Sequence, residues 1–323
     1  MRSFFVFLVL SIASILQANN PFLIVFPEIE EMSRQDYVLL QKRLRAIPKK
    51  PIEAILAMHP NPKFPGGASR AYNGVNLGII NESKGLLPIQ NLQKMGQGGS
   101  RCIVSYASYN RNYPEMIERV RQALEESGFD GYFYYRIGGF PNLTGREMQY
   151  AGVPYSFKIY MMQEAEKMGF NTVLWIDSAV YPLKNPAPLF ESIEKKGYLL
   201  HGWRIDSKDT DKTVSPAAKE SLQMLSGREV LYSNYIQANI FGLKMDTPLA
   251  QQFIYWFNRA LDIGLPFVGW YPEEPLIATL VAWLAPHWQP YHEYLNLRGG
   301  DGTQEDIEQM KQKRKGYFYT LPH

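Results

Sequence analysis

The chain has almost no means of cross-linking itself, because a single cysteine, Cys102, stands among its 323 residues. One thiol cannot form an intramolecular disulfide, so a packed core has to hold the fold together. Hydrophobic residues make up 46% of the chain, which is enough for such a core. Cys102 itself begins the apolar run CIVSYAS, and this setting predicts a buried, inert thiol.

Several common signatures are absent as well. The sequence has no Gly-x-Gly-x-x-Gly turn and no Gly-Lys-Ser/Thr phosphate loop, which argues against dinucleotide-binding and P-loop enzymes. It also lacks the Gly-x-Ser-x-Gly elbow of the α/β-hydrolases. A net charge of +3, spread along the chain, is too small to favour a nucleic-acid partner, and we predict none.

The first residues predict an export signal. Arg2 is followed by an apolar run from Phe4 to Leu16, and the small residue Ala18 comes shortly after it. A positive start, about 7–15 apolar residues and a small residue at the end are the features of a secretory signal peptide. We predict a signal peptide over residues 1–18 and a secreted or lumenal protein. Leu16 departs from the small residue preferred before a cleavage site, which leaves an uncleaved membrane anchor as the alternative.

The remaining chain divides into an arm and an α/β domain. Residues 19–100 predict an N-terminal arm, helical over 28–58 and irregular over 59–100, where Gly, Pro, Asn and Ser are frequent. From residue 101 to 323, strands and helices alternate, which predicts one α/β domain with a mostly parallel central sheet flanked by helices. The expected strands cover residues 102–108, 132–137, 173–177, 197–202, 236–243 and 317–321, and the expected helices cover residues 114–127, 155–168, 188–196, 217–225, 247–261 and 274–284.

One strand ends in a motif that suggests a site. Within the segment NTVLWIDSAVYP, the short run from Thr172 to Ile176 predicts a strand that is buried on both faces. Asp177 follows this strand directly. A carboxylate in this position lies at the carboxyl edge of the sheet, where open α/β folds bind ligands. The alternative is a purely structural turn, since Asp177 and Ser178 are ordinary turn residues.

Three segments in chain order resemble one enzyme family. They are KIYMMQEAEKMGFNTVLWIDSAVYPLKNPAPLFESIEKKGYLL, QANIFGLKMDTPLAQQFIYWF and GWYPEEPLIATLVAW, within a resemblance that spans about residues 101–295. Together they resemble the nucleotide-sugar glycosyltransferases of the GT-A fold. The resemblance implies a single GT-A-like domain of the hexosyltransferase type, which moves a sugar from a nucleotide sugar to a hydroxyl of a glycan or protein acceptor. A non-catalytic secreted relative that only binds a sugar or a nucleotide is the alternative.

The resemblance also implies a metal site, which this sequence matches only in part. GT-A enzymes carry an Asp-x-Asp motif that holds Mn²⁺ or Mg²⁺ against the diphosphate leaving group. Here Ala179 replaces the second Asp, so the motif is degenerate and the need for a metal ion is in question. Asp177 is the expected ligand, with His292 as a candidate second one.

The same resemblance assigns the other site residues. Glu273 and Glu274 are the candidates for the carboxylate that takes the acceptor proton, although acidic residues in a first helical turn also simply favour the helix dipole. The candidate nucleotide-binding residues are Ser108, Tyr109, Asn110, Lys158, Asp177 and Ser178. The candidate sugar- and acceptor-binding residues are His201, Trp203, Gln237, Asn239 and Trp270. A structural or solvated role is the alternative for each of them.

Overall fold

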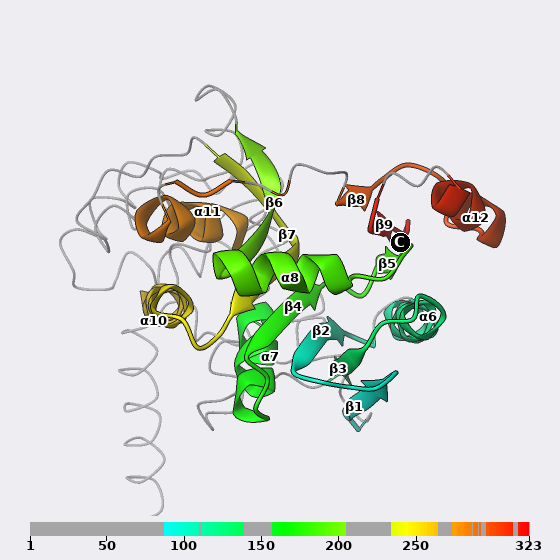
Figure 1. Ribbon diagram of the computed structural model, residues 1–323, viewed down its shortest axis with the longest axis horizontal. Helices are drawn as coiled ribbons and strands as arrows, with labels where there is room; N and C mark the ends of the chain where they lie inside the picture. The colour runs from blue at the N-terminus through cyan, green and yellow to red at the C-terminus, as the bar shows by residue number, and fades with distance from the viewer. Residues whose placement is uncertain are drawn as a thin grey trace, which may run out of the picture.

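The computed structural model describes residues 87–109, 112–138, 157–204, 234–263, 273–285, 287–289, 291, 295–312 and 316–322 (Figure 1). The elements in chain order are β1 (Ile89–Met95), β2 (Arg101–Ala107), α6 (Tyr113–Glu126), β3 (Gly131–Ile137), α7 (Phe157–Lys167), β4 (Thr172–Ile176), β5 (Val180–Pro182), α8 (Ala187–Lys196), β6 (Tyr198–Arg204), β7 (Asn234–Lys244), α10 (Pro248–Ile263), α11 (Glu273–Leu284), β8 (Asn296–Leu297), α12 (Gln304–Gln312) and β9 (Phe318–Thr320).

The main sheet has six strands in the order β1-β3-β2-β4-β7-β6. Its centre, β3-β2-β4, is parallel, while β1 and β7 run antiparallel to their neighbours. Because β6 is antiparallel to β7, it points the same way as β2, β3 and β4. The prediction of an α/β domain with a mostly parallel central sheet is therefore confirmed for the described residues.

Strand β4 is buried on both faces, as its sequence predicts. Its side chains alternate, so Val173 and Trp175 join one core cluster and Leu174 and Ile176 join the other. The first cluster also contains the apolar faces of α7, α10 and α11, and the second contains those of α6 and α8. Cys102 lies fully buried in the first cluster, which confirms the inert thiol, and burial raises its pKa.

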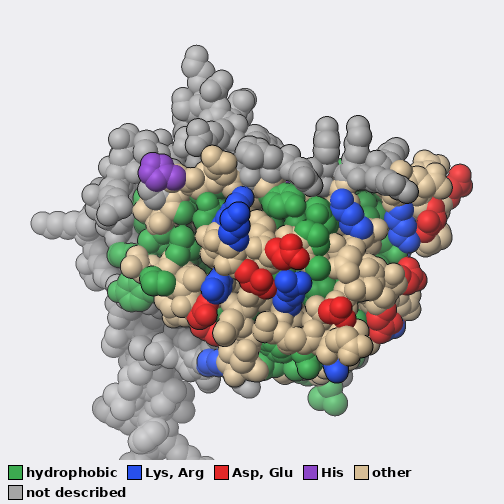
Figure 2. All heavy atoms as spheres, viewed as in Figure 1, with side chains coloured by type: hydrophobic (Ala, Val, Ile, Leu, Met, Phe, Trp, Pro, Cys, Tyr) green, Lys and Arg blue, Asp and Glu red, His purple; other side chains and the backbone are tan. Residues whose placement is uncertain are grey.

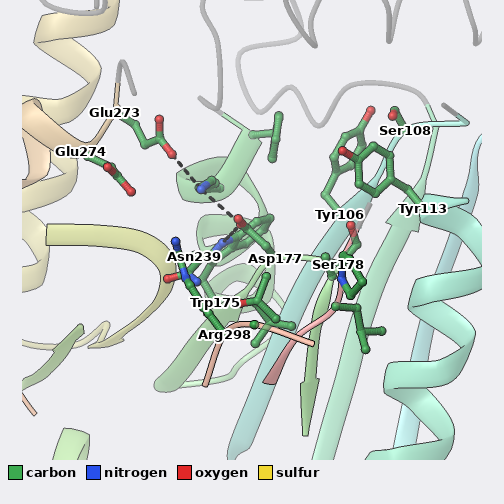
Figure 3. Close-up of a pocket in the computed structure, with 18 of the residues that line it drawn as sticks. Tyr106, Ser108, Tyr113, Trp175, Asp177, Ser178, Asn239, Glu273, Glu274 and Arg298 are labelled. Atoms are coloured by element: carbon green, nitrogen blue, oxygen red, sulfur yellow. Dashed lines mark hydrogen bonds and ion pairs between the residues drawn. The ribbon is translucent and has the colours of Figure 1, made fainter. Parts of the chain in front are cut away.

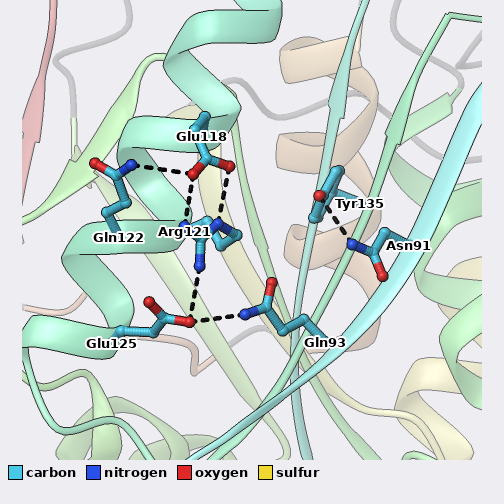
Figure 4. A network of polar contacts seen from close by, with 7 residues as sticks. All are labelled: Asn91, Gln93, Glu118, Arg121, Gln122, Glu125 and Tyr135. Carbon is cyan, nitrogen blue, oxygen red and sulfur yellow. Dashed lines mark hydrogen bonds and ion pairs between the residues drawn. The ribbon is translucent and has the colours of Figure 1, made fainter.

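Helix α6 is the amphipathic helix expected over 114–127, and its polar face is tied to strand β1. Arg121 bridges Glu118 and Glu125 along the helix, and Gln93 of β1 donates to Glu125 (Figure 4). Asn91 of β1 also donates to the hydroxyl of Tyr135 on the adjacent strand β3. These contacts fix the edge strand at the side of the sheet.

Four elements were not predicted from the sequence, among them the short strands β5 and β8. Strand β1 lies at residues 89–95, where irregular structure was expected, and α12 forms at residues 304–312, where no helix was expected. Five of the seven side chains of β1 are exposed, so it lacks the buried face that marks a strand in sequence. Helix α12 likewise buries only Ile307, which leaves almost no apolar periodicity to detect.

The C-terminal segment forms a second, smaller sheet of strand order β5-β9-β8. Strand β9 pairs antiparallel with β5, directly after the Asp177–Ala179 turn, and Phe318 and Tyr319 are buried there. The end of the chain is thus brought beside the end of β4 (Figure 1). The expected strand over 317–321 is confirmed as β9.

Charges on the face seen in Figure 2 are mixed, with acidic and basic side chains side by side. This distribution agrees with the small net charge of the chain. None of the described helices is long and apolar enough to cross a membrane. The predicted signal peptide and the helices expected over 28–58 and 217–225 lie outside the described residues.

Candidate active site at the carboxyl edge of the sheet

The strand order changes direction next to β2. From β2 the chain passes through α6 to β3 on one side, and then through α7 to β4 on the other side of β2. Such a switch leaves a crevice outside the carboxyl ends of the two diverging strands. A pocket of about 600 Å³ lies there, lined by Ser108 just after β2 and by Asp177 just after β4.

Asp177 is held firmly at the end of β4. Its amide donates to the carbonyl of Asn239 over 2.9 Å, and its carbonyl accepts from the amide of Val180 over 2.9 Å, which closes the turn. Its Oδ1 accepts a 2.8 Å hydrogen bond from the indole Nε1 of Trp175. The side chain is 37% exposed, so the carboxylate faces the pocket rather than the core.

Lys158 lies beneath this carboxylate and links it to a second one. Its Nζ is 3.1 Å from Oδ1 of Asp177 and 2.7 Å from Oε1 of Glu273, and it donates to the carbonyl of Ala238 over 3.0 Å. The lysine is 3% exposed. Burial on its own lowers the pKa of Lys158, but the charges of Asp177 and Glu273 outweigh it and raise the pKa above its ordinary value. Lys158 is therefore a fixed cation that positions two carboxylates.

Glu273 and Glu274 open helix α11 and both line the pocket. Glu273 is 3% exposed, and burial raises its pKa, an effect that the neighbouring Lys158 only partly offsets. Glu274 instead accepts a 3.0 Å hydrogen bond from the amide of Ala238 through Oε1. Of the two, Glu273 has the environment that shifts a carboxyl pKa toward neutral pH, as acid–base catalysis needs.

The pocket wall contains buried polar atoms that are left without a hydrogen bond within the described part of the chain. Among them are Oε2 of Glu273, which accepts, and Nδ2 of Asn239, which donates. Asn239 is 8% exposed, and its Oδ1 faces Nδ1 of His201 at 3.4 Å. Buried polar atoms are rarely left unpaired, so each of these atoms calls for a partner beyond the described residues, such as a water molecule or a ligand group. A hydroxyl group can donate to the carboxylate and accept from the amide.

The pocket has two chemically different ends. Figure 3 shows Asn239, Glu273 and Glu274 on one side of Asp177 and Tyr106, Ser108 and Tyr113 on the other. On the aromatic side, Tyr113 is half-buried, whereas Tyr106 is 4% exposed and packs against Phe157. The carboxylate side offers hydroxyl-binding groups.

The structure brings together seven of the predicted site residues around this pocket: Ser108, Lys158, Asp177, Ser178, Asn239, Glu273 and Glu274. Three others lie elsewhere. Tyr109 donates to the carbonyl of Leu87, Gln237 is buried without lining the pocket, and His201 reaches it only through Asn239. Burial lowers the pKa of His201, which favours its neutral form. Asn110, Trp270, His292 and the side chain of Trp203 lie outside the described residues.

Sequence reasoning missed the contribution of the C-terminal segment. Arg298, Gly299 and Gly300, directly after β8, line the pocket, as do Leu321 and Pro322 after β9. The signal was present as the run Arg-Gly-Gly-Asp-Gly, in which Gly299, Gly300 and Gly302 adopt positive φ. Nothing in the sequence indicates that this segment folds back on β5.

The described residues do not fit the divalent cation that the resemblance implies. No three His, Cys, Asp or Glu side chains of the described chain converge as a metal site. Asp177 is already paired with Lys158, and the next position of the motif is the apolar Ala179.

Comparison of the sequence with models of protein families and with curated proteins finds no match to either. Three solved structures are similar in fold. Mouse xyloside xylosyltransferase 1 in its apo form has a TM-score of 0.38 and 11% identity over 68% of this chain and 96% of its own. A glycosyltransferase that acts in glycosylation of the major capsid of PBCV-1 has a TM-score of 0.35 and 15% identity, over 68% and 92%. The bifunctional glycosyltransferase WbbM has a TM-score of 0.42 and 11% identity, over 70% and 46%.

Proposed function

We propose that the protein transfers a sugar from a nucleotide sugar to an acceptor hydroxyl. The observation that carries the proposal is the pair of unsatisfied buried atoms, Oε2 of Glu273 and Nδ2 of Asn239, in the wall of a pocket at the switch point of the sheet. A sugar hydroxyl matches this donor and acceptor pair. At the aromatic end, the half-buried ring of Tyr113 suits a nucleoside base.

The residues take distinct roles in this proposal. Glu273 accepts the proton of the acceptor hydroxyl as its oxygen attacks the anomeric carbon and the bond to the diphosphate breaks. Asn239 orients the donor sugar through its amide. Asp177, held by Trp175 and Lys158, binds hydroxyls of the donor through the oxygen that faces the pocket. Ser108 and Ser178 line the path between the two ends.

A thermal-shift screen of nucleoside diphosphates and their sugars tests whether the pocket binds a donor. We expect one nucleotide class to raise the melting temperature of the full chain, and Asp177→Asn to reduce this rise. Ser127→Ala, at the end of α6 and outside the pocket lining, is the matched control and keeps the full shift. No shift with any nucleotide would contradict the proposal.

A non-catalytic binding protein is the second candidate, because the pairing of Asp177 with Lys158 also suits a static binding pocket. Such a protein binds the nucleotide sugar without consuming it. Release of the nucleoside diphosphate therefore separates the two candidates.

The secretory address is also a proposal. It depends on residues 1–18 alone, which lie outside the described residues. N-terminal sequencing of the protein recovered from its native cells tests it. A chain that begins at Asn19 supports cleavage, and one that retains Met1 in a membrane fraction supports the anchor.

A further inference from the structure

The third position of the acidic motif lies between the pocket, which Ala179 helps to line, and an apolar cluster. Ala179 is 5% exposed and belongs to an apolar cluster with Met116, Ile307, Tyr319 and Leu321. Its carbonyl accepts a 2.8 Å hydrogen bond from the amide of Leu321, which fixes the C-terminal segment on top of it. A carboxylate at this position would lose hydration on the side of the apolar cluster, which disfavours a second Asp here.

The first position is also poorly suited to a divalent cation. Nζ of Lys158 lies 3.1 Å from Oδ1 of Asp177, so a metal ion on this carboxylate would face a second cation at short range. Lys158 cannot easily withdraw, because it also binds Glu273 and the carbonyl of Ala238 and is almost fully buried. The lysine thus occupies the electrostatic role that a metal ion would have beside Asp177.

The pocket nevertheless contains a cation that faces outward. Of the described residues that line it, Lys158 and Arg298 are the cationic ones, and Arg298 forms no ion pair with any described residue. Arg298 is exposed and begins a loop in which Gly299 and Gly300 have φ of 86° and 135°. Gly300 cannot carry a side chain, since a Cβ there would lie 2.3 Å from Oδ2 of Asp306. The loop therefore holds its backbone and Arg298 at the pocket mouth.

We propose that this site binds the diphosphate of its donor without a divalent cation, with the guanidinium of Arg298 supplying the facing positive charge. This inference rests on the proposed function. A guanidinium pairs with phosphate oxygens through two parallel hydrogen bonds, which suits a charged leaving group. Departure of the nucleoside diphosphate then leaves its negative charge beside Arg298, while the acceptor proton passes to Glu273.

Calorimetric titration of the full chain with UDP, GDP, ADP and CDP, in excess EDTA and again with Mn²⁺, tests the inference. We expect one nucleotide to bind in EDTA with a dissociation constant within about threefold of that in Mn²⁺. Arg298→Ala is expected to weaken this binding in EDTA by about 10–100-fold, the loss of one charge-assisted contact. Arg298→Lys is expected to lose less. Lys196→Ala, exposed on α8 and outside the pocket lining, is the matched control and leaves binding unchanged.

The other outcomes fail in distinguishable ways. Binding that occurs only with Mn²⁺ would overturn the metal-free inference and leave the proposed function standing. Binding in EDTA that Arg298→Ala does not change would overturn the role of Arg298. An absence of binding under both conditions would overturn the proposed function itself and the inference with it.

Discussion

At the scale of single residues, the site is organised by one buried lysine. Lys158 contributes the positive charge that allows Asp177 and Glu273 to lie close together in a largely apolar setting. An ion pair that is buried gains little net stability, but removing one partner leaves the other charge uncompensated. The lysine is therefore expected to matter for both folding and activity.

Replacing Lys158 with Met keeps the length of the side chain and removes its charge. We expect the free energy of unfolding to fall by about 3–5 kcal/mol, because the buried carboxylate of Glu273 then remains without a cation, beside that of Asp177. Chemical denaturation measures the change. Lys167→Met, exposed on the same helix, is the matched control and is expected to change stability by less than about 0.5 kcal/mol. Equal effects of the two variants would contradict the role of Lys158.

Glu273→Gln removes a carboxyl group whose pKa is raised in the folded protein. A raised pKa means that the folded state holds the proton more tightly than the unfolded state. Glu273 therefore favours folding most below its unfolded pKa of about 4.5, and this contribution is lost as pH rises toward the folded pKa. We expect wild-type stability to fall relative to Glu273→Gln above that pH, by at most about 1.4 kcal/mol per pH unit. The free energy of unfolding of both proteins is measured by chemical denaturation from pH 4 to 8. A constant difference between the two proteins over this range would contradict the raised pKa.

At the scale of the elements, the central strands could be predicted and the peripheral ones could not. The expected strand over 173–177 and helix over 274–284 lie within one residue of β4 and α11. Both elements are extensively buried, and this gives their sequences a clear apolar pattern. Strand β1 and helix α12 bury too little to leave such a pattern. The same limit applies to the site, since no local pattern places Lys158 between two carboxylates or brings Arg298 back to β4.

Strand β7 and helix α8 pack too closely for a side chain at Gly242. A Cβ there would lie 2.3 Å from Cδ1 of Ile193, which is fully buried. We expect Gly242→Ala to destabilise the protein by about 1–3 kcal/mol, as overpacking does. Ile193→Val removes the clashing methyl group, so the double variant should be more stable than the sum of the single effects predicts. Strict additivity in a double-mutant cycle would contradict this close contact.

At the scale of the whole molecule, the C-terminus completes the pocket that the central sheet begins. Strand β9 pairs with β5, and Leu321 and Pro322 line the pocket beside Ala179. Residues more than a hundred positions apart in the chain thus form one wall. We therefore expect ligand binding in the pocket to be coupled to the folding of the C-terminal segment.

A chain that ends at residue 315 tests this coupling. It removes four buried side chains, those of Tyr317, Phe318, Tyr319 and Leu321, and exposes their apolar partners. The loss of apolar burial is on the order of 5 kcal/mol, so we expect the melting temperature to fall by about 10 °C or more. A chain that ends at Pro322 keeps all four buried side chains and is the matched control. An unchanged melting temperature in the shorter chain would contradict the structural role of β9.

The central claim, sugar transfer in this pocket, is tested most directly by the release of nucleoside diphosphate. Full-length protein is incubated with a panel of nucleotide sugars, with water and simple sugars as acceptors, and released diphosphate is measured by chromatography. We predict that wild type releases one nucleoside diphosphate. Glu273→Gln should bind the same donor but release nucleoside diphosphate at least about 100-fold more slowly, the usual effect of losing a catalytic base. Donor binding without release by wild type, or equal release by Glu273→Gln, would contradict the claim.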